Sequence, residues 1–127
     1  MGERRVELTD LSTRFVDAFN RHDLDGIMSF FGDGAIFEDP EGKSHEGHDA
    51  IRAAFAPLVN GAMGNVRFDE EDFFMDVEAG KVMTGWRVSL ELEGKPASIR
   101  GLDLLLFEGD KLMRKQAYWK ADVPHFE

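Results

Sequence analysis

The chain is organised around one short segment, Ala35-Ile36-Phe37-Glu38-Asp39-Pro40, which predicts a strand that ends in a carboxylate just before a proline. Alternate side chains of a strand point to opposite faces, so Asp39 shares a face with Phe37 and Ala35. A carboxylate on the apolar side of a sheet is costly to ionise, and we therefore expect the pKa of Asp39 to rise. A second interpretation is open on these residues alone, because Asp-Pro is also common in turns.

Regular spacing of apolar residues predicts the elements on either side of this segment. Period-3.6 spacing and helix-breaking residues predict helices over Val6–Asn20 and Leu24–Phe30, a turn at Gly32-Asp33-Gly34, a polar, flexible stretch over Glu41–Gly47, and a third helix that opens at His48-Asp49 and ends or kinks at Pro57. Period-two alternation predicts strands over Val66–Asp76, Lys81–Leu92, Ala97–Phe107 and Leu112–Ala121.

This order of elements indicates an α+β fold. We expect three helices packed on one face of a curved, mostly antiparallel sheet, forming a cone whose apolar interior is open at one end. Such an opening is a natural site for a small molecule. The length of 127 residues suits one domain over residues 1–127.

Composition and charge exclude several classes of partner. The net charge of -10 argues against nucleic acid and anionic membrane surfaces, which require a basic patch. No apolar run is long enough to span a membrane, and the first residues lack the apolar core of a signal peptide, so we expect a cytoplasmic protein. The chain has no cysteine, and His45 and His48 lie close in sequence without an acidic ligand set. We expect neither a metal nor another cofactor.

A second carboxylate, Asp103, lies inside the strand predicted over Ala97–Phe107 and is surrounded by apolar residues in sequence. A charge within a strand is uncommon unless it is paired or neutralised. One interpretation is an ion pair with Arg100, Arg87 or Arg114. The other is a carboxylic acid held protonated, which could donate a hydrogen bond to a substrate oxygen.

Two carboxylates in one apolar cavity indicate divided roles. An ionised carboxylate can remove a proton from a carbon next to a carbonyl group, and a neutral one can stabilise the enolate oxygen. The sequence therefore predicts that Asp39 and Asp103 divide these two roles between them.

Several segments resemble the bacterial Δ5-3-ketosteroid isomerases. They are Ala18–Ile27, Ala35–Pro40, Gly47–Arg52, Val88–Glu91, Gly94, Leu102-Asp103 and Ala117–Trp119, and together they span nearly the whole chain. The resemblance implies the cone-shaped fold of the nuclear transport factor 2-like superfamily, to which the isomerases and the SnoaL-like polyketide cyclases belong.

The resemblance also implies roles for individual residues. Asp39 falls on the general base that moves a proton within the steroid, Asp103 on the protonated acid of the oxyanion hole, and Trp119 on the indole beside the base. Pocket-lining apolar positions fall on Trp86, Val88 and Leu90.

The chain departs from the isomerase pattern in its tyrosines and at one lysine. The oxyanion tyrosine falls on Phe15, and two supporting tyrosines fall on Phe31 and Phe55. Lys115 stands where the isomerases have an apolar residue. If it points inward it could pair with Asp103 or Asp39, and if it lies near the opening its amine could reach outward to water.

Three functions follow as expectations. The first is an isomerase-like enzyme that moves a proton next to a carbonyl in a flat, apolar ligand, and the second is a SnoaL-like polyketide cyclase. The third is a non-catalytic module that binds a hydrophobic small molecule. We also expect a homodimer, because the outward face of the long strands carries an apolar patch, Leu102, Leu104, Leu106 and Tyr118.

Overall fold

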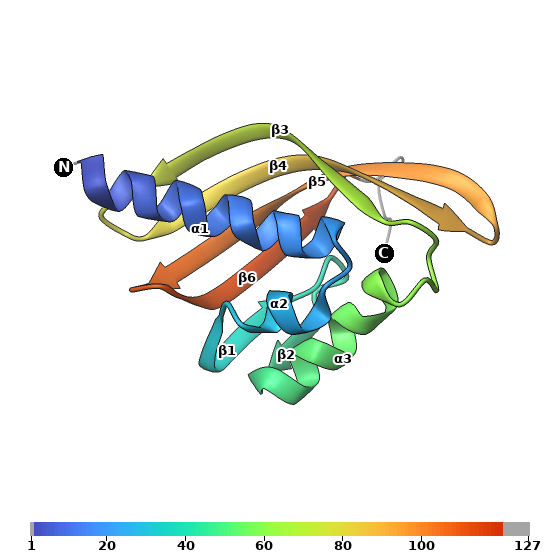
Figure 1. Cartoon of the computed structure of the whole chain (residues 1–127), viewed down its shortest axis with the longest axis horizontal. Helices are drawn as coiled ribbons and strands as arrows, with labels where there is room; N and C mark the ends of the chain where they lie inside the picture. Colours follow the sequence, from blue (N-terminus) through green and yellow to red (C-terminus); the bar gives the residue numbers. More distant parts are fainter. Residues whose placement is uncertain (1, 121–127) are drawn as a thin grey trace, which may run out of the picture.

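One curved sheet and three helices make up residues 2–120, the part of the chain that the computed structural model describes. The elements follow in the order α1 (Gly2–Asn20), α2 (Leu24–Met28), β1 (Phe31–Glu38), β2 (Ser44–Glu46), α3 (Gly47–Val59), β3 (Arg67–Asp76), β4 (Lys81–Leu92), β5 (Lys95–Glu108) and β6 (Lys111–Trp119) (Figure 1). The strand order is β2-β1-β6-β5-β4-β3, and β1 runs parallel to β6 while the other neighbours are antiparallel. The predicted α+β fold is confirmed.

The helices form where apolar spacing predicted them, with different ends. Helix α1 begins at Gly2 and not at Val6, and its exposed first turn carries Glu3, which interacts favourably with the positive end of the helix dipole. Asp23 caps α2 by accepting a hydrogen bond from the Gly26 N–H. Pro57 does not end α3, which continues to Val59.

Two local predictions around the first strand are wrong. Gly32-Asp33-Gly34 is part of β1 and not a turn, with an irregular register against β6 between Phe31 and Ile36. The stretch predicted to be flexible contains β2, in which His45 lies opposite Phe37. The second error arises because pairing with β1, and not local sequence, makes Ser44–Glu46 a strand. In the first, the glycines mark an irregularity inside β1, where Gly34 has a φ of +74°.

The long strands match the predicted alternation closely. Strand β4 has the predicted bounds, and the loop to β5 is only two residues, Glu93 and Gly94, both with positive φ as a tight hairpin requires. Strand β3 forms one edge of the sheet and exposes its acidic run. Ala121, the predicted end of the last strand, lies outside the described residues.

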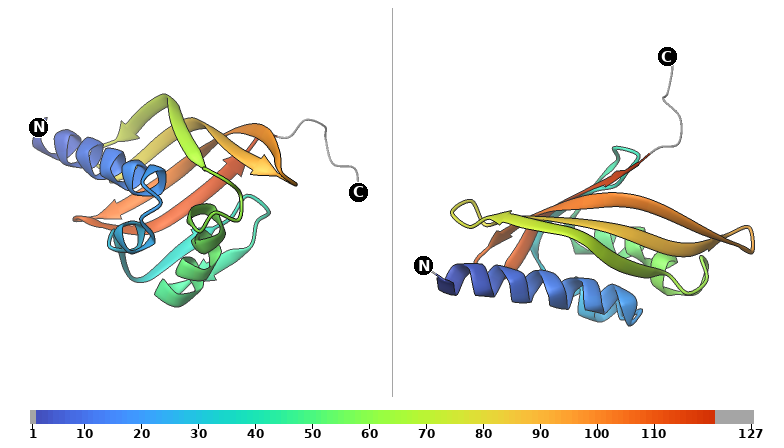
Figure 2. Two further views of the ribbon diagram at one scale, coloured as in Figure 1. Left: turned by 45° about the vertical axis from the view of Figure 1, so that its right-hand side comes forward. Right: turned by 90° about the horizontal axis from the view of Figure 1, so that it is seen from above.

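The helices lie on one side of the sheet, as Figure 2 shows for α1 and α3. A buried cluster that includes Phe15, Phe19 and Phe55 fills the space between the helices and the inner face of the sheet. A smaller cluster, Val66, Trp86, Val88 and Leu90, lies against the inner face at β4. Among residues 2–120 no helix is long and apolar enough to cross a membrane.

Candidate active site

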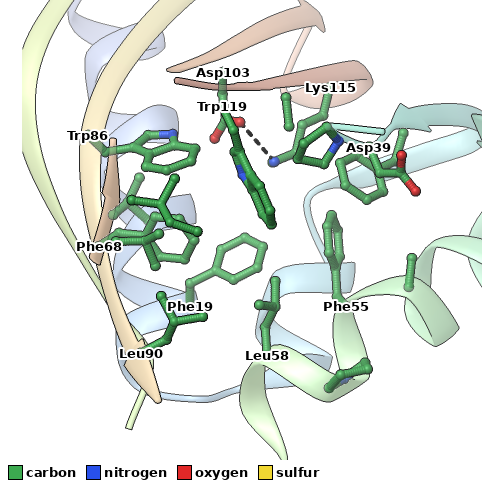
Figure 3. Close-up of a pocket in the computed structure, with 18 of the residues that line it drawn as sticks. Phe19, Asp39, Phe55, Leu58, Phe68, Trp86, Leu90, Asp103, Lys115 and Trp119 are labelled. Carbon is green, nitrogen blue, oxygen red and sulfur yellow. Dashed lines mark hydrogen bonds and ion pairs between the residues drawn. The ribbon is translucent and has the colours of Figure 1, made fainter. Parts of the chain in front are cut away.

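An apolar cavity of about 410 Å³ opens between the helices and the inner face of the sheet. This volume lies within the range of small-molecule pockets. Figure 3 shows aromatic side chains from helices and strands directed into it, among them Phe19, Phe55 and Trp86. The polar side chains in its wall are Asp39, His45, Glu70, Thr84, Asp103 and Lys115.

The structure places nearly all of the predicted site residues around this cavity. Its lining includes Asp39, Asp103, Phe15, Phe55, Trp86, Val88, Leu90, Lys115 and Trp119. The exception is Phe31, which is buried behind the wall, with its ring 5.7 Å from that of Phe15 and 5.8 Å from that of Phe55. Phe31 supports the aromatic wall and does not form its surface.

Asp39 accepts hydrogen bonds within the turn after β1 and also lies at the edge of the cavity wall (Figure 3), so both interpretations of this residue describe part of its position. Its Oδ1 accepts hydrogen bonds from the backbone N–H groups of Glu41 and Lys43, both at 3.0 Å. Its Oδ2 lies 3.0 Å from Nε2 of His45. Burial raises the pKa of Asp39, but the hydrogen bonds from His45, Lys43 and Glu41 outweigh burial and lower it overall. The expected rise is therefore wrong, because donors that favour the charged form surround this carboxylate.

Sequence reasoning missed His45 as a site residue, and also Thr84 and Glu70 of the cavity wall. Strand β2 places it beside Asp39, and its ring stacks on Phe37 with a centroid separation of 5.5 Å and an interplanar angle of 19°. A carboxylate can only accept, so Nε2 of His45 carries the proton in this contact, and in a neutral ring Nδ1 keeps its lone pair. The sequence does contain an indication of this position, because Asp39-Pro40-Glu41-Gly42 is typical of a turn. Such a turn returns the chain antiparallel to β1.

Asp103 and Lys115 form a buried ion pair in the wall. Nζ of Lys115 donates to Oδ1 of Asp103 at 3.0 Å, and the side chains are 8% and 9% exposed. The partner of Asp103 is thus none of the three arginines, and Arg87 and Arg100 pair with Glu71 instead. The contact does not fit a neutral Asp103 that donates to a ligand, since the donor in the pair is the ammonium group of Lys115.

Aromatic rings surround the Lys115 ammonium group on its other sides. Its Nζ lies 4.8 Å from the ring centroid of Phe37 and 5.5 Å from that of Phe55. Ring faces attract a cation, and the attraction grows when water is excluded. Lys115 therefore stays inside the cavity and does not reach outward to water.

Two further polar atoms of the wall have no hydrogen-bond partner among residues 2–120. They are Oγ1 of Thr84 and Nε1 of Trp86, in side chains that are almost fully buried. Thr84 lies opposite Asp103 in the β4–β5 register, so its hydroxyl group is on the same side of the cavity as the ion pair, and Trp86 follows two residues later on β4. Burial also raises the pKa of Glu70, an exposed residue of β3 that lines the cavity. A ligand that carries oxygen atoms could accept hydrogen bonds from Oγ1 of Thr84 and Nε1 of Trp86.

The wall thus combines an Asp–His pair with a cationic donor. A carboxylate next to an imidazole can accept and pass a proton, and a buried ammonium group can stabilise a developing oxyanion. Within residues 2–120, His, Asp and Glu side chains do not gather in a group of three that could hold a metal ion.

A family model for the SnoaL-like domain matches residues 12–115 of this sequence. The chain belongs to the SnoaL-like domain family. The match begins in the middle of α1 and ends within β6, at Lys115. It therefore includes every polar side chain named above in the cavity wall. It identifies the SnoaL-like family and not the ketosteroid isomerases that the sequence resembles.

Several solved structures have the same fold as this chain. The epoxide hydrolase/cyclase-like enzyme SalBIII, which has a role in pyran ring formation in the polyether salinomycin, matches with a TM-score of 0.82 at 19% identity, over 94% of this chain and 95% of that one. An NTF2-like protein of unknown function from Mesorhizobium loti matches with a TM-score of 0.78 at 20% identity, over 93% and 94%. TerC, crystallised with polyporic acid, matches with 0.77 at 18% identity, over 90% and 92%. The fold is that of the nuclear transport factor 2-like superfamily.

Proposed function

We propose that this SnoaL-like domain is an acid–base enzyme that moves a proton next to a carbonyl group in a flat, apolar ligand of the polyketide or steroid type. One observation supports this most directly: the Asp39–His45 pair and the Lys115–Asp103 pair line the same apolar cavity. A base and a cationic donor in one apolar site are the two groups that enolate formation requires.

The proposed roles differ from the isomerase pattern at the oxyanion. The ligand carbonyl oxygen accepts a hydrogen bond from Lys115, which makes the neighbouring C–H more acidic and then stabilises the enolate. Asp39 takes the proton, and His45 orients its carboxylate through the 3.0 Å contact with Oδ2. Asp103 holds Lys115 in place and balances its charge. Lys115 thus takes the part of the missing tyrosine at Phe15.

An assay that does not require the natural substrate can test this function. 2-Tetralone is a flat bicyclic ketone whose exchangeable C–H groups can be followed by NMR in D₂O, and 5-androstene-3,17-dione forms a conjugated enone that absorbs in the ultraviolet. We expect the protein to accelerate proton exchange in the tetralone, and Asp39→Asn and Lys115→Met each to reduce the rate on the order of 100-fold or more. Formation of the conjugated enone from 5-androstene-3,17-dione would show that the enzyme also accepts steroids.

The other two candidate functions predict different outcomes in the same assay. A polyketide cyclase would share the proton-transfer step and then close a ring with the enolate. The structural likeness to SalBIII, an enzyme with a role in pyran ring formation, favours this alternative. A non-catalytic binding module would bind the tetralone but leave its exchange at the buffer rate. Binding of the tetralone without faster proton exchange would thus reject both enzyme hypotheses.

The homodimer remains a proposal, supported by the outer face of the sheet. Leu102, Leu104 and Leu106 of β5 are half-buried there, while Tyr118 and Phe74 are 45% and 65% exposed. The register places Phe74, Met83 and Leu104 side by side across three strands. The cytoplasmic location and the single-domain organisation over residues 1–127 also stay predictions.

A further inference from the structure

Lys115 is the one primary amine in the cavity wall among the described residues. It projects from the middle of β6, between Phe37 of β1 and Leu105 of β5 in the strand register. Strands on both sides hold its backbone, so its amine has a fixed position inside the apolar space. An amine in such a place can act as a nucleophile toward a bound carbonyl carbon as well as a hydrogen-bond donor.

The surroundings of this amine suit a cation that persists through a covalent reaction. Asp103 lies 3.0 Å from Nζ, and the rings of Phe37 and Phe55 face it at 4.8 and 5.5 Å. An iminium ion formed from the amine keeps one positive charge at nearly the same atom. The carboxylate and the ring faces that stabilise the ammonium group would stabilise the iminium ion equally.

We propose that Lys115 forms an iminium ion with apolar aldehydes and ketones that enter the cavity. The proposal rests on the proposed function, because it gives a covalent form to the same carbonyl site. Its ligand class is an aromatic or polycyclic carbonyl compound, as the apolar wall requires, with further oxygen atoms placed to reach Thr84 and Trp86.

The reaction balances with residues that are already in contact. The ammonium group of Lys115 passes one proton to Asp103 across the 3.0 Å hydrogen bond, and the free amine attacks the carbonyl carbon. Proton transfer from nitrogen to oxygen gives a neutral carbinolamine. Asp103 then returns its proton to the carbinolamine hydroxyl, the C–O bond breaks, and water leaves as the C=N bond forms. The products are water, an iminium ion on Lys115 and an ionised Asp103.

The iminium ion gives the Asp39–His45 pair a clear task. A C–H group next to C=N⁺ is more acidic than the same group next to a neutral carbonyl, so Asp39 can remove its proton despite a lowered pKa. The resulting enamine is a carbon nucleophile, which could take back a proton at another carbon or attack within the ligand. Hydrolysis of the iminium ion by one water releases the product and restores the amine.

Reductive trapping tests the covalent step directly. The wild-type protein is incubated with 6-methoxy-2-naphthaldehyde and cyanoborohydride, and the adduct is located by intact mass and peptide mapping. We expect one adduct at Lys115 that forms before any at the exposed Lys95 and Lys111, and that an excess of 2-tetralone suppresses. Labelling of the exposed lysines with none at Lys115 would overturn the proposal.

Two variants distinguish this inference from the proposed function. Lys115→Arg keeps a cationic donor but cannot form an iminium ion, and Lys115→Met with Asp103→Leu removes both charges so that no unpaired carboxylate is left buried. We expect both variants to lose the adduct and the tetralone exchange. Exchange retained by Lys115→Arg would reject the iminium ion and leave the acid–base function in place. An adduct on the wild type without exchange would reject that function and keep the iminium ion.

Discussion

At the scale of single residues, Asp39 joins the turn after β1 to the chemistry of the cavity. The backbone N–H groups of Glu41 and Lys43 hold one oxygen, and His45 holds the other. These donors favour the charged carboxylate, which explains why its pKa is lowered although it is partly buried. The same contacts fix the direction of the carboxylate, and a base requires a fixed direction.

A lowered pKa in the folded state makes stability depend on pH in a definite direction. The contribution of Asp39 to stability is fully present above the pKa that this residue has in the unfolded chain, which is about 3.9. It is lost as the pH falls through the lower pKa that Asp39 has in the folded protein. We expect Asp39→Asn to reduce the free energy of unfolding at neutral pH, and the difference from wild type to shrink in acid. His45→Ala removes one of the donors to Asp39 and should therefore raise the pKa of Asp39. It should also lower the free energy of unfolding by about 1 kcal/mol. Urea unfolding at a series of pH values measures both effects.

A control for this prediction is Asp25→Asn, because Asp25 is 87% exposed and pairs with Arg52 on the surface. Surface ion pairs contribute little, so this variant should change stability only slightly. A pH-independent difference between wild type and Asp39→Asn would show that the donors around Asp39 do not favour its charged form.

Most of the site residues predicted from the sequence line the cavity, but of their pairings only Lys115 with Asp103 was considered, as one of several alternatives. Asp39, Asp103 and Lys115 were noticeable as charged residues at the end of, or within, apolar strands. Their partners depend on which strands lie side by side. Lys115 pairs with Leu105 in register and reaches Asp103 diagonally, and His45 reaches Asp39 only because β2 forms. The turn sequence after β1 indicates locally that the chain turns back along this strand, but no local pattern indicates how Lys115 and Asp103 lie in register.

At the scale of elements, the close approach of β4, β5 and β6 positions the indole of Trp86. Gly101 of β5 lies between Trp86 and Trp119 in the register. A Cβ atom at this position would lie 2.6 Å from Cη2 of Trp86 and would collide with the carbonyl oxygen of Tyr118. Glycine is therefore required here for the indole to lie against the sheet.

Substitution of this glycine should disturb the cavity wall. We expect Gly101→Ala to destabilise the protein by about 1–3 kcal/mol, because the Tyr118 carbonyl belongs to the backbone and cannot yield easily. Displacement of the buried Trp86 should also shift its fluorescence and weaken binding of 2-tetralone. Gly2→Ala is the control, since nothing lies within 4 Å of a Cβ at that position. If Gly101→Ala were as stable as Gly2→Ala, β5 and its neighbouring strands could move apart without loss of stability, and the prediction would be wrong.

Elements were easiest to predict where local pattern and final pairing agree. Strand β4 alternates in polarity from Trp86 to Leu92 and was predicted with its observed bounds. Strand β2 has three residues and no apolar alternation, so only its pairing with β1 makes it a strand. Gly32 and Gly34 indicate a turn locally, yet β6 pairs with Phe31 before them and with Ile36 after them, so they form an irregular part of β1. Partners distant in sequence explain both differences.

At the scale of the whole molecule, the two faces of the sheet have separate tasks. The inner face and the helices enclose the cavity, while no helix of residues 2–120 covers the apolar part of the outer face (Figure 2). On that outer face, Leu104 lies between Met83 and Gln116, and Leu102 lies beside Tyr118. An exposed apolar face rimmed by charged residues commonly marks an interface, and a second copy of the chain would cover it without blocking the cavity.

The outer face therefore predicts how one substitution changes the oligomeric state. We expect the wild-type protein to sediment as a dimer and Leu104→Glu to sediment as a monomer, because the new carboxylate would lie unpaired at the centre of the interface. Val6→Glu is the matched control: it introduces the same charge at an exposed apolar residue of α1, on the other side of the sheet, and should leave the dimer intact. Since the cavity opens on the opposite face, Leu104→Glu should still bind 2-tetralone with wild-type affinity. A wild-type monomer, or a Leu104→Glu dimer as strong as the wild-type one, would show that this face is not the interface.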